Sequence, residues 1–353
     1  MTRPLHIGDL DHILRHTDGL WEELRGERIL VTGGTGFFGC WLLESFLHAN
    51  RELGLNAQAT VLTRDAKAFG KKAPHLASER AITLLEGDVR GFEFPREQHA
   101  FVIHAATDSG GKQAEGGPLE LALTIADGTR RALDFSRSRG TRKFLLTSSG
   151  AVYGKQPPEI VHLAETFTGG PDPLLASSGY GESKRFAEQL CAAASSDRPE
   201  LECKIARCFA FVGPHLPLDA HFAIGNFIRD AMEGRPIRIA GDGTPCRSYL
   251  YAADLAIWLW TMLFRAPALK AFNVGSDESI SIADLARATA EALRPGLEIV
   301  VAGAPDPSGP VELRPVSRYV PSTQRANDEL GLKTLVDLND AIRRTAAWHG
   351  YEP

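Results

Sequence analysis

The sequence predicts an α/β protein built on a doubly wound parallel sheet, with a smaller C-terminal α/β domain. Short apolar segments alternate with helical segments between residues 28 and 144. The short segments are apolar throughout rather than at every second position, which is typical of parallel strands covered on both faces. The alternation loosens after Pro214, and a chain of 353 residues is long for one core. We therefore expect two domains.

The expected elements follow one another along the chain. Apolar runs that end in glycine, proline or polar residues predict strands at residues 28–34, 57–65, 81–89, 100–107, 143–149, 202–214 and 272–276. Helical spacing predicts helices at 39–53, at 118–140 with Gly140 as its end, and at 281–293 with Ser281 as its cap. A helix and a short strand are expected within 226–241, and the apolar run 255–264 is expected to be a buried helix.

These elements suggest domain boundaries. We expect a helical extension over residues 1–26, packed on the first domain through apolar side chains at helical spacing. The sheet domain is expected over 27–212, with segments near 246–275 returning to it. Residues 213–245 and 276–353 are expected to form the smaller domain.

Composition excludes several classes of protein. The net charge of −5 gives no electrostatic case for a nucleic-acid partner. The longest apolar run has ten residues, whereas a membrane span needs about 18, and the N-terminus lacks the apolar segment of a secretory signal. The five cysteines contain no Cys-x-x-Cys pair and indicate a reducing compartment. We expect a cytoplasmic chain with no membrane segment.

A glycine-rich turn follows the first expected strand and opens a helix. In "TGGTGFFG", two other residues separate Gly33 from Gly36 and Gly36 from Gly39. At a strand-to-helix junction such glycines let the backbone approach a pyrophosphate, whose charge the amides of the helix N-terminus meet. The motif predicts a dinucleotide site, and its candidate cofactor contacts are Gly33, Thr35, Gly36, Phe37, Phe38 and Gly39.

The end of the second strand bears on the choice of dinucleotide. An acidic residue there binds the ribose hydroxyls of NAD, whereas an arginine accommodates the 2′-phosphate of NADP. The strand ends in Thr63 and Arg64, and Asp65 follows. Arg64 at this place favours NADP. A strand that ends one residue later would instead let Asp65 bind the ribose hydroxyls of NAD. A third interpretation, in which Arg64 is a solvated loop residue, stays an alternative.

Tyr180 and Lys184 lie four residues apart in "YGESK" and would share one face of a helix. Tyr180 is the only tyrosine with a lysine at this spacing. Alone, the pair also fits two solvated side chains on a surface. A dinucleotide site upstream makes it a candidate catalytic couple.

Six motifs now stand in a characteristic order: "TGGTGFFG", "GDVR", "HAA", "SSGAVYG", "YGESK" and "RSYLYAADLA". From about Arg28 to about Gly331, the chain resembles extended short-chain dehydrogenases/reductases, specifically the NAD-dependent epimerase/dehydratase family, which modifies nucleotide-activated sugars. The resemblance implies a Rossmann-type fold and an NAD or NADP cofactor. It also implies a nucleotide-diphosphate sugar as substrate, and a homodimer is common in this family.

The resemblance also implies catalytic roles. It makes Tyr180 the acid/base, Lys184 its partner and a ligand of the nicotinamide ribose, and Ser149 the third member, with Ser148 as the fallback. Ser148 and Ser149 are also candidate substrate contacts. A phenol has an ordinary pKa near 10, so we expect the Lys184 ammonium and the nicotinamide to lower the pKa of Tyr180.

Further contacts follow from the same resemblance. Asp88 and Val89 would line the adenine, and Ala105, Ala106 and Thr107 the phosphates and ribose. The nucleotide and diphosphate of the substrate would be held by Asn226, Arg247 and Arg314, and an arginine fork suits phosphate oxygens. Surface arginines and a helix-facing asparagine are the alternatives. Asp127 and Ala210 stand where the family usually has asparagine.

Positions at which this chain differs from the family pattern narrow the range of reactions that we expect. Family 4,6-dehydratases carry acidic residues after the serine or threonine, and the decarboxylases tend to carry a glutamate there; this chain has Gly150 and Ala151. Dehydration would need an acid from elsewhere, such as Glu182. A UDP-hexose 4-epimerase is the leading expectation, and an NADPH-dependent 4-keto-sugar reductase is the alternative. A non-catalytic NADP-binding sensor is disfavoured because Ser149, Tyr180 and Lys184 are all retained.

No metal site is expected. His215 and His221 are six residues apart without a carboxylate at ligand spacing. His104 is expected to be a hydrogen-bonded strand histidine. A Gly-x-Ser-x-Gly nucleophile motif is absent, so hydrolase chemistry has no support.

Overall fold

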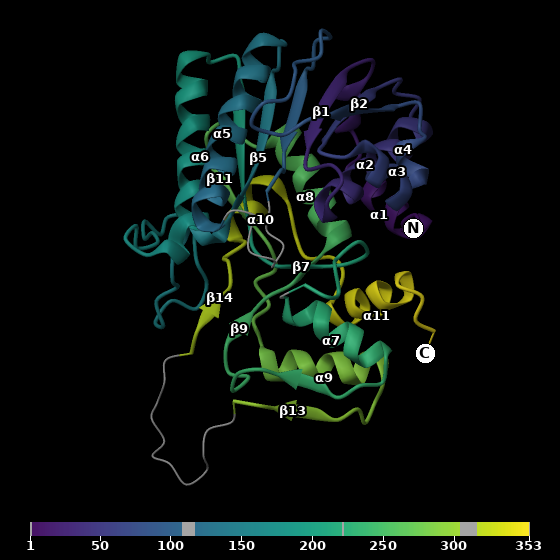
Figure 1. Ribbon diagram of the computed structural model, residues 1–353, viewed down its shortest axis with the longest axis vertical. Helices are drawn as coiled ribbons and strands as arrows, with labels where there is room; N and C mark the ends of the chain where they lie inside the picture. Colours follow the sequence, from purple (N-terminus) through teal and green to yellow (C-terminus); the bar gives the residue numbers. More distant parts are fainter. Residues whose placement is uncertain (1, 108–116, 221, 304–315, 353) are drawn as a thin grey trace.

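The computed structural model describes residues 2–107, 117–220, 222–303 and 316–352. Its main sheet has seven parallel strands in the order β11-β6-β5-β4-β1-β2-β3 (Figure 1). Their bounds are β1 Arg28–Thr32, β2 Gln58–Thr63, β3 Ile82–Glu86, β4 Phe101–His104, β5 Lys143–Ser149, β6 Glu202–Cys208 and β11 Ala271–Val274. The strand order reverses between β1 and β4, where ligands bind in open α/β sheets.

Helices cover both faces of this sheet, which confirms the predicted fold class. Along β1, Leu30 faces one apolar cluster while Ile29 and Val31 face the other, because side chains alternate along a strand. The first face is covered by α5 (Gly117–Ser138) and α6 (Gly179–Asp197), and the second by α1 (Ile7–His16), α2 (Phe37–Glu52) and α8 (Ala252–Arg265).

The apolar run 255–264 lies within α8, whose residues from Ala252 to Phe264 are all buried. The predicted buried helix is therefore confirmed. In the described parts of the chain, no helix combines the length and the hydropathy that a membrane span requires.

The N-terminal residues form α1 and a short turn, η1 (Trp21–Leu24), that pack on α2 and α8. Asp9, inside α1, accepts hydrogen bonds from the Tyr251 hydroxyl at 2.8 Å and from Arg344 at 2.6 Å. The extension is thus tied to the start of α8 and to the last helix, α11 (Leu338–Trp348).

A second group of elements lies below the carboxyl end of the main sheet (Figure 1). Helices α7 (Ala223–Met232), α9 (Ile282–Leu293) and α11 pack together, with β8 (Ile237–Ile239) paired to β13 (Ile299–Val301). A small sheet joins β12 (Ile280–Ser281), β9 (Cys246–Arg247) and β14 (Arg318–Tyr319). The other elements are α3 (Ala66–Lys72), α4 (Pro74–Ala77), η2 (Gly150–Tyr153), η3 (Ala176–Ser178) and α10 (Gln324–Leu330).

The expectation of one continuous strand over residues 202–214 is wrong. The segment 202–214 does not stay in the main sheet: β6 ends at Cys208, and β7 (Phe211–Val212) pairs instead with β10 (Leu250–Tyr251). The cap predicted at Ser281 is confirmed, since its hydroxyl accepts the Asp284 N–H at 3.0 Å. The helix expected over 118–140 ends at Ser138, and Gly140 follows in the left-handed region at φ 69°.

Candidate active site

The glycine-rich turn joins β1 to α2 at the point where the strand order reverses. Gly33 has φ 71°, and a Cβ on it would lie 2.5 Å from the Ala105 carbonyl oxygen. A Cβ on Gly39 would lie 2.3 Å from the backbone of Gly34. The two glycines therefore let this turn lie directly against its neighbouring backbone, which a larger residue would prevent.

Gly36 is the N-cap of α2, and among the described residues no side chain caps this helix end. The first turn of α2 carries no acidic residue, so neither a side-chain cap nor a negative charge from this turn meets its first N–H groups and the positive end of the helix dipole. Thr35 stands in the same turn, and its carbonyl accepts a hydrogen bond from Lys72 at 2.8 Å. Phe37 and Phe38 are the first residues of the helix. The turn fits the pyrophosphate of a dinucleotide.

The end of β2 is formed by Thr63, and Arg64 follows as an exposed residue. Asp65 is the cap of α3, accepting the Ala68 N–H at 2.8 Å. One oxygen of the Asp65 carboxylate is thus hydrogen-bonded to the helix backbone. The Arg90 guanidinium donates a hydrogen bond to the Asp88 carboxylate at 2.9 Å. The hydrogen bonds from Arg90 lower the pKa of Asp88, and the charge of Arg64 lowers it by a smaller amount. Arg64 and Asp88 therefore lie on the same edge of the candidate cofactor site.

The residues expected beside the adenine and ribose also lie along this edge. Gly128 leaves room for Val89, because a Cβ on that glycine would lie 2.9 Å from a Val89 methyl. Ala105 and Ala106 follow β4, and their N–H groups bond to Thr32 at 3.1 and 3.2 Å. These alanines face the glycine turn, as the close approach at Gly33 shows.

Lys184 is buried in α6 with 3% exposure. Its ammonium donates to the Thr107 hydroxyl at 2.7 Å and to the Thr147 carbonyl at 2.9 Å. The nitrogen lies 5.9 Å from the centre of the Tyr180 ring. Burial lowers the pKa of Lys184 to about 8. The alternative of a solvated surface pair is therefore wrong.

Ser149 ends β5 and is also buried, at 6% exposure. Its oxygen accepts the Ala151 N–H at 3.1 Å. In the protein alone, burial raises the pKa of Tyr180, and the neighbouring Ser149 hydroxyl only partly offsets this. The expected lowering of this pKa by Lys184 together with the nicotinamide stays a prediction.

Ser148 faces away from this group. Its hydroxyl donates at 2.6 Å to Glu188, which in turn pairs with Arg207 at 2.7 Å. Neighbouring strand residues point to opposite faces, and Glu188 lies two helical turns beyond Tyr180. The structure does not bring the fallback Ser148 together with the catalytic couple.

An aromatic pair that the sequence did not reveal completes the site. A Cβ on Gly150 would lie 2.6 Å from the Phe209 ring and 2.7 Å from the Tyr319 hydroxyl. The two rings pack against each other with centres 4.7 Å apart. Neither residue belongs to a readable motif; the glycine after Ser149 was the only signal that something fills this space.

The expected substrate residues are more dispersed. Arg247 lies in β9, where Tyr319 is its register partner in β14. Asn226 is a partly exposed residue of α7, and Arg314 lies outside the described residues. Asp127 makes a long ion pair with Arg130 at 3.7 Å on α5. Ala210 accepts the Leu250 N–H through its carbonyl at 3.1 Å.

His104 is hydrogen-bonded inside the sheet, as predicted. Its Nδ1 lies 2.8 Å from the Thr32 hydroxyl and its Nε2 3.2 Å from the Thr129 hydroxyl. Burial lowers its pKa to about 3. His215 bonds to Glu44 at 3.0 Å, and His221 lies outside the described residues. Within the described ranges, no cluster of three or more potential metal ligands occurs.

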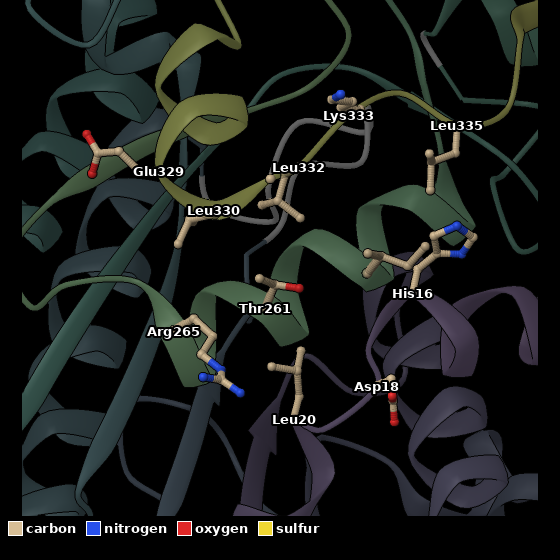
Figure 2. A pocket seen from close by; sticks show the side chains of 12 residues that line it. His16, Asp18, Leu20, Thr261, Arg265, Glu329, Leu330, Leu332, Lys333 and Leu335 are labelled. Atoms are coloured by element: carbon tan, nitrogen blue, oxygen red, sulfur yellow. The ribbon is translucent and has the colours of Figure 1, made fainter.

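A separate cavity of about 550 Å³ lies away from this site (Figure 2). It opens between α1, α8 and the segment that follows α10. Its lining mixes apolar side chains with both signs of charge, and none of the candidate site residues contributes to it: His16, Asp18, Leu20, Ile257, Thr261, Arg265, Glu329, Leu330, Gly331, Leu332, Lys333 and Leu335. Its lining gives no indication of cofactor chemistry.

Fold and site together define an enzyme of the extended short-chain dehydrogenase/reductase class. A sequence model of the NAD dependent epimerase/dehydratase family matches residues 29–275, so the chain belongs to this family.

Similar proteins carry out several reactions. UDP-glucuronic acid decarboxylase 1 of Arabidopsis thaliana is 28% identical over 324 residues, covering 90% of this chain and 68% of that protein. UDP-glucose 4-epimerase of Thermotoga maritima has TM-score 0.75 at 22% identity, covering 91% of this chain and 98% of that one. dTDP-glucose 4,6-dehydratase of Streptomyces venezuelae, solved with NAD, has TM-score 0.74 at 20% identity, covering 91% and 96%. The names of these three relatives give three different reactions on nucleotide sugars.

Proposed function

We propose that the protein is an NAD(P)-dependent 4-epimerase of the UDP-hexose type. The observation that carries this proposal is the space beside Ser149. Phe209 and Tyr319 fill the volume where an acidic side chain at position 150 would stand. Ala151 also carries no acid. With no carboxylate at either of the two positions that follow Ser149 in the sequence, the site favours redox at one carbon over elimination or decarboxylation.

The chain's own residues supply the proton chemistry. Tyr180 takes the proton of the sugar C4 hydroxyl and later returns it. The Ser149 hydroxyl lies between the reacting oxygen and the Tyr180 phenolate, and donates its single proton to one of these two oxygens at a time. Lys184, fixed by Thr107 and Thr147, brings a positive charge to the same pocket. The bound nicotinamide supplies the hydride acceptor and donor.

We propose NADP as the preferred cofactor. Arg64 stands directly after β2, and the carboxylate of Asp65 is committed to capping α3. The preference of Arg64 for a 2′-phosphate supports this assignment. Solved relatives contain NAD, so the choice between the two dinucleotides is a test of Arg64.

The substrate is proposed to be a nucleotide-diphosphate sugar held by the smaller domain, residues 213–245 and 276–353, with Arg247 from the returning segment. Arg247, Arg314 and Asn226 are its proposed contacts. The structure supports Arg247 best, because β9 and β14 place it next to Tyr319, which reaches Ser149.

The alternative is an NADPH-dependent reductase of a 4-keto sugar nucleotide. It shares Ser149, Tyr180 and Lys184 and differs in exchanging its cofactor after each turnover. Arg64 is the observation that favours it, since a preference for NADP suits a reductase.

Cofactor content separates these two functions. Denaturing the purified protein and identifying the released dinucleotide is expected to give near-stoichiometric oxidised cofactor, and UDP-hexoses are then expected to be epimerised at C4. An empty site that consumes NADPH with a 4-keto sugar nucleotide would replace the epimerase by the reductase.

We also propose a cytoplasmic homodimer. The five cysteines are unpaired, which is typical of a reducing compartment. Helices α5 and α6 pack side by side and expose apolar side chains, with Leu119 68% and Phe186 52% exposed. A second copy of the chain would cover them. Light scattering of the purified protein tests this; a monomer at micromolar concentration would contradict it.

A further inference from the structure

Tyr319 reaches Ser149 from a distant part of the chain. Strand β14 holds it beside Arg247 of β9, and its ring packs on Phe209 at an angle of 36°. Its hydroxyl lies 2.7 Å from the place a Cβ on Gly150 would take. Because Gly150 directly follows Ser149, the phenol oxygen lies in the neighbourhood of this serine.

The hydrogen bonds of Ser149 can be counted. A serine hydroxyl donates one proton and accepts two hydrogen bonds. One acceptor position takes the Ala151 N–H at 3.1 Å. The phenols of Tyr180 and Tyr319 both lie near the same hydroxyl, which lowers the pKa of each. If Tyr319 donates to the second acceptor position, the Ser149 proton must point toward Tyr180 or the substrate oxygen beside it.

We propose that Tyr319 is a positioning residue that donates to Ser149 and thereby directs the Ser149 proton toward Tyr180 and the reacting oxygen. This proposal rests on the redox function proposed above. It makes Tyr319 act through Ser149, without contact with the reacting carbon.

The surroundings of Tyr319 keep it a donor. Burial raises the pKa of Tyr319. The Ser149 hydroxyl partly offsets this rise. The charged and titratable groups that face Tyr319 are Tyr180, Cys208 and Arg247; Tyr180 and Cys208 raise this pKa further and Arg247 lowers it. A neutral phenol is therefore available to Ser149 across the pH range in which Tyr180 works.

A titration of the phenols tests this proposal without any substrate. Phenolate absorbance is followed against pH in the wild-type protein and in Tyr319→Phe, Ser149→Ala and the double variant, each with and without added NADP. Tyr180→Phe serves as the blank that isolates Tyr180. Phenylalanine keeps the ring against Phe209 and removes only the hydroxyl.

The expected result is an apparent pKa of Tyr180 that is higher in Tyr319→Phe than in the wild-type protein. In the Ser149→Ala background, the Tyr319→Phe change is expected to have no further effect, because the two residues act in series. An unchanged pKa in Tyr319→Phe would overturn the proposal. So would an equal rise with and without Ser149.

Turnover gives a second readout. In Tyr319→Phe, kcat is expected to fall about tenfold, the loss of one hydrogen bond at a reacting centre, with KM for the sugar nucleotide little changed. The rising limb of the pH profile is expected to move upward. A higher KM with kcat unchanged would make Tyr319 a substrate contact instead. If no sugar nucleotide reacts with the wild-type protein, the proposed function fails while the titration still decides the role of Tyr319.

Discussion

The two sides of Ser149 are built in different ways. On one side, β5 and α6 bring Tyr180 and Lys184 to the serine, and Lys184 is fixed by two hydrogen bonds. On the other side, Phe209 and Tyr319 reach Gly150 from separate parts of the chain. The first side gathers polar groups, to which we assign the proton chemistry, and the second is lined by aromatic rings.

The Tyr180 side is built from one strand and the helix packed on it. The Gly150 side leaves no room for a larger side chain beside the serine. In this protein the aromatic rings and the glycine fit each other, so an acid at position 150 would have to displace Phe209 and Tyr319.

The largest effect is expected from Tyr180→Phe, which breaks the polar side. Turnover should fall by a factor of about 10²–10⁴, the usual contribution of a general acid/base, while dinucleotide binding stays close to that of the wild-type protein. Steady-state kinetics and a binding titration measure the two effects. Tyr351→Phe removes a phenol that bonds to the Leu293 carbonyl far from Ser149 and is the matched control. Equal losses in both variants would refute the assignment.

The burial of Lys184 predicts a pH dependence of stability. Its folded pKa of about 8 lies below the ordinary value of 10.5, so between these values the unfolded chain binds more protons and stability rises with pH. Relative to Lys184→Met, the wild-type protein should gain on the order of 3 kcal/mol of unfolding free energy across this range. Denaturant unfolding at several pH values measures it. A constant difference between the two proteins would contradict the buried position.

The Gly150 side is tested by Gly150→Ala. The new methyl group would overlap Phe209 and the Tyr319 hydroxyl, so the unfolding free energy should fall by about 1–3 kcal/mol, as overpacking usually costs. Gly70→Ala, a helical glycine with open space around its Cβ position, is the matched control and should be neutral or slightly stabilising. Thermal unfolding compares them. An undisturbed Gly150→Ala would mean that the aromatic rings do not fill this space.

The smallest effect concerns the cofactor. Arg64→Ala should weaken NADP binding by about tenfold, because one charge-assisted hydrogen bond is lost, and leave NAD binding unchanged. Arg80→Ala, also exposed, should change neither. Titration with both dinucleotides measures this, and equal weakening of NADP and NAD by Arg64→Ala would assign Arg64 another role.

The two sides also differ in what the sequence could predict. The glycine turn and the Tyr180–Lys184 pair are local patterns whose spacing directly determines their geometry. The structure places the turn at the reversal of the strand order and the pair on α6, with Lys184 bonded to Thr107 and Thr147. Tyr319 could not be predicted, because its place depends on how β14 pairs with β9. The same limit explains the strand expected over 202–214: apolar composition does not reveal that β7 leaves the main sheet to pair with β10.

The most direct test of the proposed epimerase follows the hydrogen on C4. A UDP-hexose deuterated at C4 is incubated with the purified protein, and the product is examined by NMR. An epimerase is expected to give the C4 epimer with deuterium still on C4, because the hydrogen is removed and returned within one site. Deuterium found on C6, or lost to free cofactor, would show elimination or net redox instead and would contradict the proposed epimerase.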